Sequence, residues 1–402
     1  MRNWSRPAVV VTLAAAAILM VTMGARQSLG LFVSPLNTST GLGIATISLA
    51  LAVAQFVWGA AQPVAGALAD RYGPGPVLVG GVLLSALGVA LTPFMTSGFG
   101  LIVSLGLVMA IGAGAGSFSV LLGAAAQRLP AETRGTASGI INAGGSFGQF
   151  VFAPITQKMI QGFGWMGAMW GLAAMTLLAL PLVGMAAGKG YTQPKALPGD
   201  TGIWNAVRGA ARDRSYLLLN AGFFTCGFHI AFLVTHLPGE VDLCGLPPTV
   251  AGWSLAIIGL ANIAGSLLAG ASISRYRSKH TLALMYGSRA LLIAVYLLAP
   301  KTALTFYLFA AGLGLTWLAT VPPTAAIVGK LFGIRYLATL FGITLLTHQV
   351  GGFLGAWLGG LAFEASGNYQ WMWYADIALS ALAAAVNLPI REAPLRAVPA
   401  AA

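Results

Sequence analysis

Long apolar runs alternate with short polar breaks along the whole chain. A helix needs about 20 apolar residues to cross the hydrocarbon core of a bilayer, and the sequence contains twelve runs of that size. The pattern therefore predicts an all-α membrane protein with twelve transmembrane helices. Their approximate ranges are 7–36, 43–69, 77–95, 99–127, 136–160, 165–188, 215–241, 249–274, 281–299, 302–329, 336–363 and 368–390.

One polar linker is much longer than the other breaks, and it covers residues 189–214. It divides the predicted spans into two sets of six. We therefore expect residues 1–188 to form an N-terminal six-helix bundle and residues 215–402 to form a C-terminal one. The linker between them is expected to lie in the cytoplasm.

Lysine and arginine are distributed unevenly between alternate breaks. With the N-terminus inside, seventeen of the 21 cations fall on inner segments, and only Lys158 and Lys301 fall on outer ends. The remaining two, Arg26 and Arg289, lie within predicted spans. Inner loops of membrane proteins carry an excess of Lys and Arg, so both termini are predicted to be cytoplasmic. The same rule explains the net charge of +12 without a nucleic-acid partner.

The composition excludes a soluble protein. Hydrophobic residues make up 57% of the 402 residues and charged residues only 7%, whereas soluble domains average about 25% charged residues. Cys226 and Cys244 are too few for a disulfide framework and are expected to be ordinary residues. The short loops and termini favour a multi-pass protein of the bacterial inner membrane.

The two halves of the chain repeat each other. Gly24-Ala-Arg26, with a proline nine residues after the arginine, is matched by Gly227-Phe-His229, with a proline nine residues after the histidine. Three further glycine pairs recur at offsets of 203 or 204 residues. The first span therefore has a counterpart in the second half, which argues against a cleaved signal peptide. The glycine pairs are Gly66 with Gly270, Gly139 with Gly342, and Gly148 with Gly351.

The segment GALADRYGPGP, residues 66–76, follows the second predicted span. It is similar to the loop signature of major facilitator transporters, which are built from two six-helix repeats of the same orientation. The resemblance implies that Asp70 and Arg71 act in gating, by locking the inner helix ends through charge pairing. A helix cap with an inside-positive arginine is the alternative interpretation.

Arg26 followed by SLGLFVSPL, together with FGITLLTHQVGGFLGAWLGG in the eleventh span, resembles the monocarboxylate-porter branch of this superfamily and its bacterial relatives. The resemblance implies transport of a small monocarboxylate. Animal members carry an Asp and an Arg four residues apart in helix 8, where this chain has Asn262 and Ser266. We therefore expect Asn262 and Ser266 to bind substrate without charge, and proton coupling to use other residues.

Arg26 is a charged side chain inside an apolar span. Such a group costs at least about 2.5–3.5 kcal/mol near the membrane centre, so it normally faces a bundle interior or an aqueous path. None of the nine acidic residues lies near the middle of spans 1, 4, 7 or 10 on this map. We predict that the guanidinium binds the carboxylate of a transported anion. Snorkelling to the outer surface, or bonding to backbone carbonyls, is the alternative.

His229 is the repeat counterpart of Arg26, and an imidazole gains and loses a proton near neutral pH. We predict that His229 faces Arg26 across a central path and that His229 or His348 couples protons, because no central acid is available. A hydrogen-bonded interior histidine is the alternative. Arg289 lies in a peripheral span, and we expect a structural role near Tyr286 and Tyr296, with substrate binding as the alternative.

Further polar side chains repeat at helical spacing. Most such residues join membrane helices through hydrogen bonds, but those nearest the predicted path also qualify as substrate contacts. The stripes are Gln55 and Gln62; Asn142, Ser146 and Gln149; Thr225, His229 and His236; and Thr344 and His348. The predicted substrate-binding residues are Arg26, His229, Asn262, His348, Gln55 and Asn142.

These observations predict a secondary active transporter that moves a small organic anion, such as lactate, with protons by alternating access. An exporter of amphipathic or drug-like compounds and an organic-anion exchanger are the rival functions. An enzyme is disfavoured, because the spans contain no His-rich metal cluster, nucleophile elbow or close acidic pair. The expected partners are the anion, protons and the lipid bilayer. We expect a monomer without cofactor or metal.

Overall fold

The computed structural model describes residues 5–188 and 202–392. Every regular element in these residues is a helix. The first half contains α1 (Arg6–Gln27), η1 (Ser28–Phe32), α2 (Val33–Thr40), α3 (Ile44–Tyr72), α4 (Pro74–Leu91), η2 (Thr92–Phe94), α5 (Gly98–Leu101), η3 (Ile102–Met109), α6 (Ala110–Ala115), α7 (Phe118–Arg128), α8 (Ala131–Leu177) and α9 (Leu180–Ala187). The second half contains α10 (Ile203–Ala210), α11 (Arg214–Leu243), α12 (Pro248–Ser272), α13 (Ser278–Leu298), α14 (Ala303–Thr316), α15 (Val321–Phe332), α16 (Leu337–Ser366) and α17 (Gln370–Asn387).

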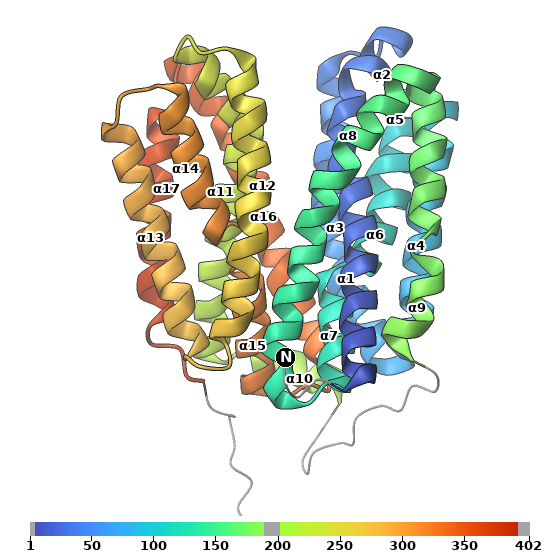
Figure 1. Ribbon diagram of the computed structural model, residues 1–402, viewed down its shortest axis with the longest axis vertical. Coiled ribbons are helices and arrows are strands. Elements are labelled where there is room, and N and C mark those ends of the chain that lie inside the picture. The colour runs from blue at the N-terminus through green and yellow to red at the C-terminus, as the bar shows by residue number, and fades with distance from the viewer. Residues whose placement is uncertain (1–4, 189–201, 393–402) are drawn as a thin grey trace, which may run out of the picture.

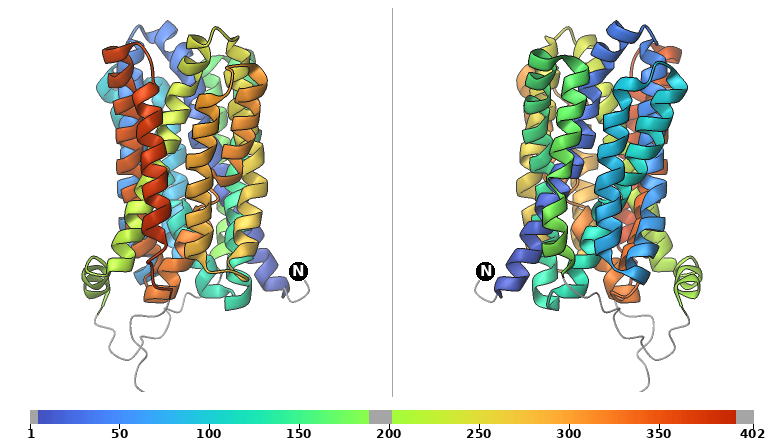
Figure 2. Two further views of the ribbon diagram at one scale, coloured as in Figure 1. Left: turned by 90° about the vertical axis from the view of Figure 1, so that its left-hand side faces the viewer. Right: turned by 90° about the vertical axis from the view of Figure 1, so that its right-hand side faces the viewer.

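Two groups of upright helices stand side by side (Figure 1). Helices α1 to α9 form one group, called the N-bundle below, and α11 to α17 form the other, called the C-bundle. The two bundles meet at the end where α10 and both ends of the described chain lie, and they diverge toward the opposite end (Figures 1 and 2). We call these the closed end and the open end. Most of the predicted linker, residues 189–201, lies outside the described residues.

The prediction of an all-α membrane protein is confirmed. Ten helical stretches of the described residues are long and apolar enough to cross a membrane. Predicted spans 136–160 and 368–390 are also largely helical, in α8 and α17, but are not among these ten. The element labelled α8 consists of two helices joined at Gly164, which contain the fifth predicted span and most of the sixth. Gly164 breaks its geometry with a φ of 69°, a conformation that a residue with a side chain rarely adopts.

Two predicted spans are interrupted at membrane depth. The fourth span breaks at Gly116 and Ser117, between α6 and α7, and the tenth breaks at 317–320, between α14 and α15. Irregular backbone at this depth requires partners for the freed carbonyls. The hydroxyl of Thr22 donates to Gly116 O at 3.0 Å, and the thiol of Cys226 lies 3.7 Å from Trp317 O. Each break is therefore supported by the first helix of its own bundle.

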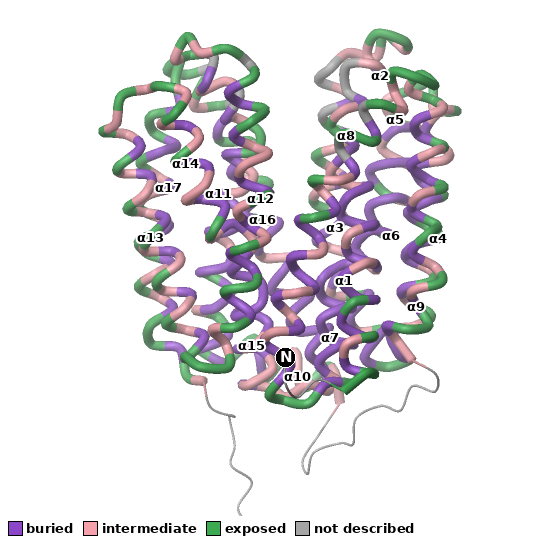
Figure 3. Tube along the Cα trace, in the orientation of Figure 1, coloured by how far each residue is buried: buried purple, intermediate pink, exposed green. Residues whose placement is uncertain are grey.

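Small residues allow the bundles to touch at the closed end. A Cβ on Gly66 of α3 would lie 2.4 Å from Ala338 O of α16, and one on Gly270 of α12 would lie 2.7 Å from Gly135 O of α8. Both distances are too short for any side chain. Buried residues accordingly fill the region between the bundles toward the closed end (Figure 3). Contact between the bundles thus depends on glycine at these positions.

The contact between α12 of the C-bundle and α8 of the N-bundle ends partway along the molecule. Gly270, Ser266, Asn262 and Gly259 follow one another along one face of α12, at spacings of three and four residues. The first three meet α8, whereas a Cβ on Gly259 would have no neighbouring atom of the described chain within 4 Å. A gap therefore opens between the bundles about one helical turn beyond Asn262.

We expect Gly270→Leu to weaken the closed end, because the added side chain meets backbone that cannot move aside; overpacking of this kind costs about 1–3 kcal/mol. The measurement is the alkylation rate of a cysteine introduced at Ser266, a fully buried position. Gly259→Leu is the matched control on the same helix face and should leave that rate unchanged. Equal rates in the two variants would contradict the packing described here.

Candidate functional site

Arg26 lies near the end of α1 and points into the protein. Its Nη2 donates to Oε1 of Gln55 on α3, and its guanidinium lies over the ring of Trp58, 4.1 Å from the ring centre. Within the described part of the chain Arg26 makes no ion pair. The side chain therefore neither snorkels freely nor relies on backbone carbonyls, and an amide and an aromatic face hold the cation.

Gln55 continues this contact into the C-bundle. Its Nε2 donates to Oε1 of Gln349 on α16 at 3.4 Å, and Gln349 Nε2 donates back to Gln55 O at 3.3 Å. Nδ1 of His348 lies 3.0 Å from the same Gln349 oxygen. The four side chains Arg26, Gln55, Gln349 and His348 form a polar chain from one bundle to the other, called the arginine bridge below.

A second set of polar contacts joins α8 to α12 and to the break in the tenth span. Asn142 Nδ2 donates to Ser266 Oγ at 2.7 Å and to Leu318 O at 2.8 Å. Asn262 Nδ2 donates to Ser146 Oγ, and Asn262 Oδ1 accepts from Leu318 N at 2.9 Å. This asparagine bridge therefore ties the broken backbone of the C-bundle to a helix of the N-bundle.

A small pocket lies beside Arg26, inside the N-bundle. Its cavity volume is about 10 Å³, which is room for about one water molecule. The hydroxyl of Ser85 reaches it and has no hydrogen-bond partner among the described residues. Its lining contains one cation and no acid: Thr22, Ala25, Arg26, Leu29, Ser85, Val89, Met109, Ala113 and Thr176.

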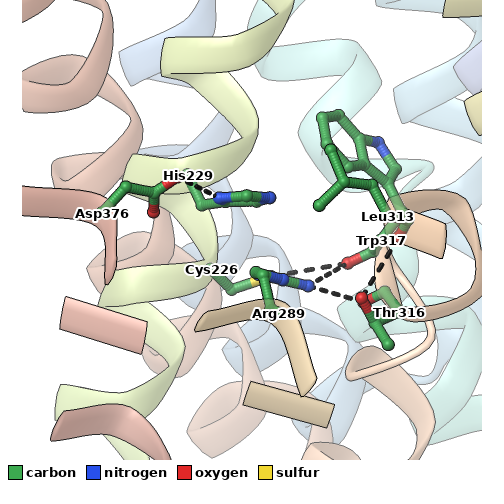
Figure 4. Close-up of polar contacts among 7 residues, drawn as sticks. All are labelled: Cys226, His229, Arg289, Leu313, Thr316, Trp317 and Asp376. Carbon is green, nitrogen blue, oxygen red and sulfur yellow. Dashed lines mark hydrogen bonds and ion pairs between the residues drawn. The ribbon is translucent and has the colours of Figure 1, made fainter. Parts of the chain in front are cut away.

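His229 does not lie on an open central path, so the expectation that it faces Arg26 across such a path is wrong. Its side chain is fully buried in the C-bundle, and its Nδ1 lies 2.5 Å from Oδ2 of Asp376 on α17 (Figure 4). The premise that no interior acid is available is also corrected. Asp376 comes from the twelfth predicted span, which is not among the four spans in which an acid was sought, and no spacing rule pairs it with α11.

Arg289 is likewise directed inward rather than toward the periphery. It is fully buried on α13, and its Nη2 donates to Thr316 O at 2.6 Å and to Trp317 O at 3.3 Å (Figure 4). These carbonyls end α14, where the helix dipole places partial negative charge. The expected neighbour Tyr286 is present, with its ring centre 5.5 Å from the guanidinium, whereas Tyr296 instead donates to Glu240.

The pocket beside Arg26 and the cluster around His229 occupy equivalent places in the two repeats. Arg26 corresponds to His229 and the pocket residue Ser85 to Arg289, at offsets of 203 and 204 residues, and Ala173 corresponds to Asp376 at an offset of 203. One repeat therefore places small neutral side chains around a cation. The other fills the same positions with a permanent cation and an acid.

Asp70 connects the bundles at the closed end. Its Oδ2 accepts from the backbone N of Thr339 at 2.9 Å and from the Thr339 hydroxyl at 2.7 Å. Thr339 lies in the first turn of α16, where free N–H groups and the helix dipole favour an anion. Arg71 is exposed and lies against Tyr72. The two members of the predicted gating pair thus have different surroundings, and only Asp70 spans the bundle interface.

The remaining polar stripes act mainly as local hydrogen-bond partners. His236 Nε2 lies 2.8 Å from Ala356 O, and the Thr344 hydroxyl donates to Leu340 O at 3.2 Å. Gln62 is fully buried, and its amide has no partner among the described residues. None of these three residues lines the pocket beside Arg26.

Sequence comparison assigns this chain to a family of membrane transporters. The Major Facilitator Superfamily model matches residues 15–356 and 244–402, so the chain belongs to that family. Among its relatives is monocarboxylate transporter 13 of Rattus norvegicus, 28% identical over 333 residues, or 80% of this chain and 73% of the relative. The MFS-type transporter YcxA of Bacillus subtilis (strain 168) is 23% identical over 381 residues, covering 90% of each chain.

Solved structures support the same fold. The transporter FucP in its outward conformation superposes with a TM-score of 0.72 at 14% identity, and the match covers 95% of this chain and 99% of FucP. At this identity the likeness concerns the fold alone. The predicted resemblance to major facilitator transporters, with relatives among the monocarboxylate transporters, is therefore confirmed.

Asp70→Ala should destabilise the protein by about 1.5–3 kcal/mol, because it leaves two donors of Thr339 without their charged acceptor. Thermal unfolding of the purified protein in detergent measures the loss. Arg71→Ala is the adjacent control, and as an exposed substitution it should stay within about 0.5 kcal/mol of the parent. If both variants unfold at the same temperature, Asp70 does not stabilise the closed end.

Proposed function

We propose that this protein is a secondary active transporter of small organic anions, with monocarboxylates such as lactate as the substrate class. The observation that carries the proposal is the environment of Arg26, a cation inside the N-bundle that lines a pocket without an acid. A substrate carboxylate would supply the missing negative charge. The relatives named monocarboxylate transporter support this class.

In this proposal the residues of the arginine bridge bind the anion together. Arg26 presents a planar fork of donors suited to a carboxylate, while Gln55 and His348 reach the same chain of contacts from α3 and α16. Binding of an anion would compete for the Arg26 contact with Gln55. Loss of that contact would loosen one of the two bridges between the bundles.

Alternating access would exchange the observed arrangement for one that is open at the opposite end. The bundles touch through Gly66, Gly270 and Asp70 at the end that carries both described termini. If this end is cytoplasmic, as the distribution of cations predicts, the observed state faces outward.

Uptake of labelled lactate into proteoliposomes tests the substrate class. Arg26→Gln should lower kcat/KM about ten- to a hundredfold, because a hydrogen bond to a charged group is worth about 1.5–3 kcal/mol and each 1.4 kcal/mol is about tenfold. Arg275→Gln removes an exposed cation and is the matched control. Unchanged uptake by a well-folded Arg26→Gln protein would rule out the anion-binding role.

An imposed pH gradient separates proton symport from anion exchange. Symport predicts that an inward proton gradient drives lactate accumulation and that a protonophore abolishes it. Exchange instead requires a second organic anion on the opposite side of the membrane, whatever the pH difference. A panel of lipophilic drug-like compounds covers the exporter alternative, for which transport of the panel should persist in Arg26→Gln.

A further inference from the structure

The C-bundle encloses an acid, an imidazole and a permanent cation. Asp376, His229 and Arg289 each have 0% of their surface exposed. An isolated charge in such surroundings is strongly unfavourable, so each must be balanced by a neighbour. Arg289 balances Asp376 in net charge only while His229 is neutral. A proton on His229 leaves the cluster with one excess positive charge.

Each of these three side chains has hydrogen-bonding atoms without a partner in the described chain. The atoms are Nε2 of His229, Oδ1 of Asp376, and Nε and Nη1 of Arg289. The free acceptor on Asp376 is complementary to the free donors on Arg289. Buried polar groups are normally satisfied. The cluster therefore has an unused pairing available, between Arg289 and Asp376.

We propose that His229, Asp376 and Arg289 form a proton-binding site whose occupancy controls the break in the tenth span. A proton from water binds Nε2 of His229, and the imidazolium then pairs with the Asp376 carboxylate through Nδ1. Arg289 in this state holds Thr316 O and Trp317 O, which is the observed arrangement. Release of the proton removes the positive charge beside Asp376, and Arg289 turns from the carbonyls to the carboxylate.

The break in the tenth span transmits this change to the N-bundle. Trp317 O accepts from Arg289, and the next residue, Leu318, makes both backbone contacts of the asparagine bridge. Asn142 of the N-bundle contributes one of these contacts. A shift of the backbone at residues 316–318 therefore alters the link between the bundles. Proton binding inside one bundle thereby acts on their relative position.

Other titratable groups around His229 are few. Cys226 lies on the same helix and interacts with His348 of α16, and Tyr286 accompanies Arg289 on α13. The ring of Trp317, at the end of α14, lies edge-on to the imidazole of His229 with 5.7 Å between ring centres, but an indole does not titrate. Helix α12 carries no acidic, basic, cysteine or tyrosine residue. The charged and titratable groups around His229 are therefore Asp376, Arg289, Cys226, Tyr286 and His348.

The N-bundle shows that the fold does not require these charges. Ser85 and Ala173 occupy the positions equivalent to Arg289 and Asp376, at offsets of 204 and 203 residues, and the broken fourth span there is supported by the neutral Thr22. The charged version is therefore a property of the C-bundle and not of the architecture. This contrast favours a functional role over a structural one.

The purpose of this site rests on the proposed transport function, but its protonation can be measured without substrate. Spin labels at Thr38→Cys and Ala365→Cys, exposed positions of α2 and α16, report the distance between the bundles at the open end. Cys244→Ser removes the partly exposed native thiol, and Cys226 is fully buried. The ratio of the two distance populations is recorded between about pH 5 and pH 8, where an imidazole titrates.

In the parent protein the ratio should change about tenfold over this range, a modest shift of a two-state equilibrium. In His229→Asn it should change less than about twofold, and in Arg289→Gln it should likewise lose its response to pH. His280→Asn, at an exposed position, is the matched control and should behave like the parent. A parent protein without pH response, or His229→Asn with the parent's response, would overturn the proposal.

A second measurement keeps the cluster intact and so does not depend on these variants folding. Histidine labelled with ¹³C is followed by NMR in protein carrying His236→Asn and His280→Asn, which leaves His229 and His348 as the only labelled residues. His348→Gln then assigns the two signals. The His229 signal should titrate with the midpoint of the distance change, and a signal that never titrates in folded protein would refute the site. Failure of lactate uptake alone would instead count against the proposed substrate.

Discussion

The balance of charge in a medium that does not solvate it is the constraint on which this structure depends. Arg26 is only partly exposed, Arg289 and Asp376 are fully buried, and each of the three is held by different groups. An amide and an aromatic face hold the first, the carbonyls of a broken helix hold the second, and an imidazole contacts the third. Because each of these contacts joins at least two helices, the positions of the charges fix the packing around them.

Backbone groups freed by helix breaks also need a partner inside the protein. The carbonyl of Gly116 is satisfied by Thr22 within one bundle, whereas the backbone of Leu318 is shared between Asn142 and Asn262 from different bundles. The two repeats thus solve one problem in different ways. Because Asn142 and Asn262 both contact Leu318, the interface between the bundles depends on the backbone geometry at that residue.

Much of the fold could be predicted from the sequence, because apolar runs report membrane depth directly and the recurrence of Gly66 at Gly270 reports the repeat. The pairing of His229 with Asp376 could not. Hydropathy places both in spans, but only the packing of α11 against α17 brings them together. The inward direction of Arg289 was missed for a similar reason: the outer position of a helix does not tell which of its faces a side chain uses.

Four predicted substrate-binding residues lie in contacts between the bundles, and their role in binding stays a prediction. Gln55, Asn142, Asn262 and His348 all lie in the two bridges, since polar residues at helical spacing in a membrane must meet other polar groups. Gln349 was not predicted, because the helical spacing in this span was followed through Thr344 and His348. The break at 317–320 was also missed, since no proline or glycine occupies these four positions and the adjacent prolines suggest only a helix start.

Half of the contact between Asp70 and Thr339 is made by main chain. An amide hydrogen is present in every residue except proline, so position 339 can drift among most amino acids and still offer a donor to the carboxylate. Position 70 has no comparable substitute for its acceptor. Substitutions should therefore be tolerated better at position 339 than at position 70. Among natural relatives, position 339 of α16 should vary while position 70 of α3 stays constant.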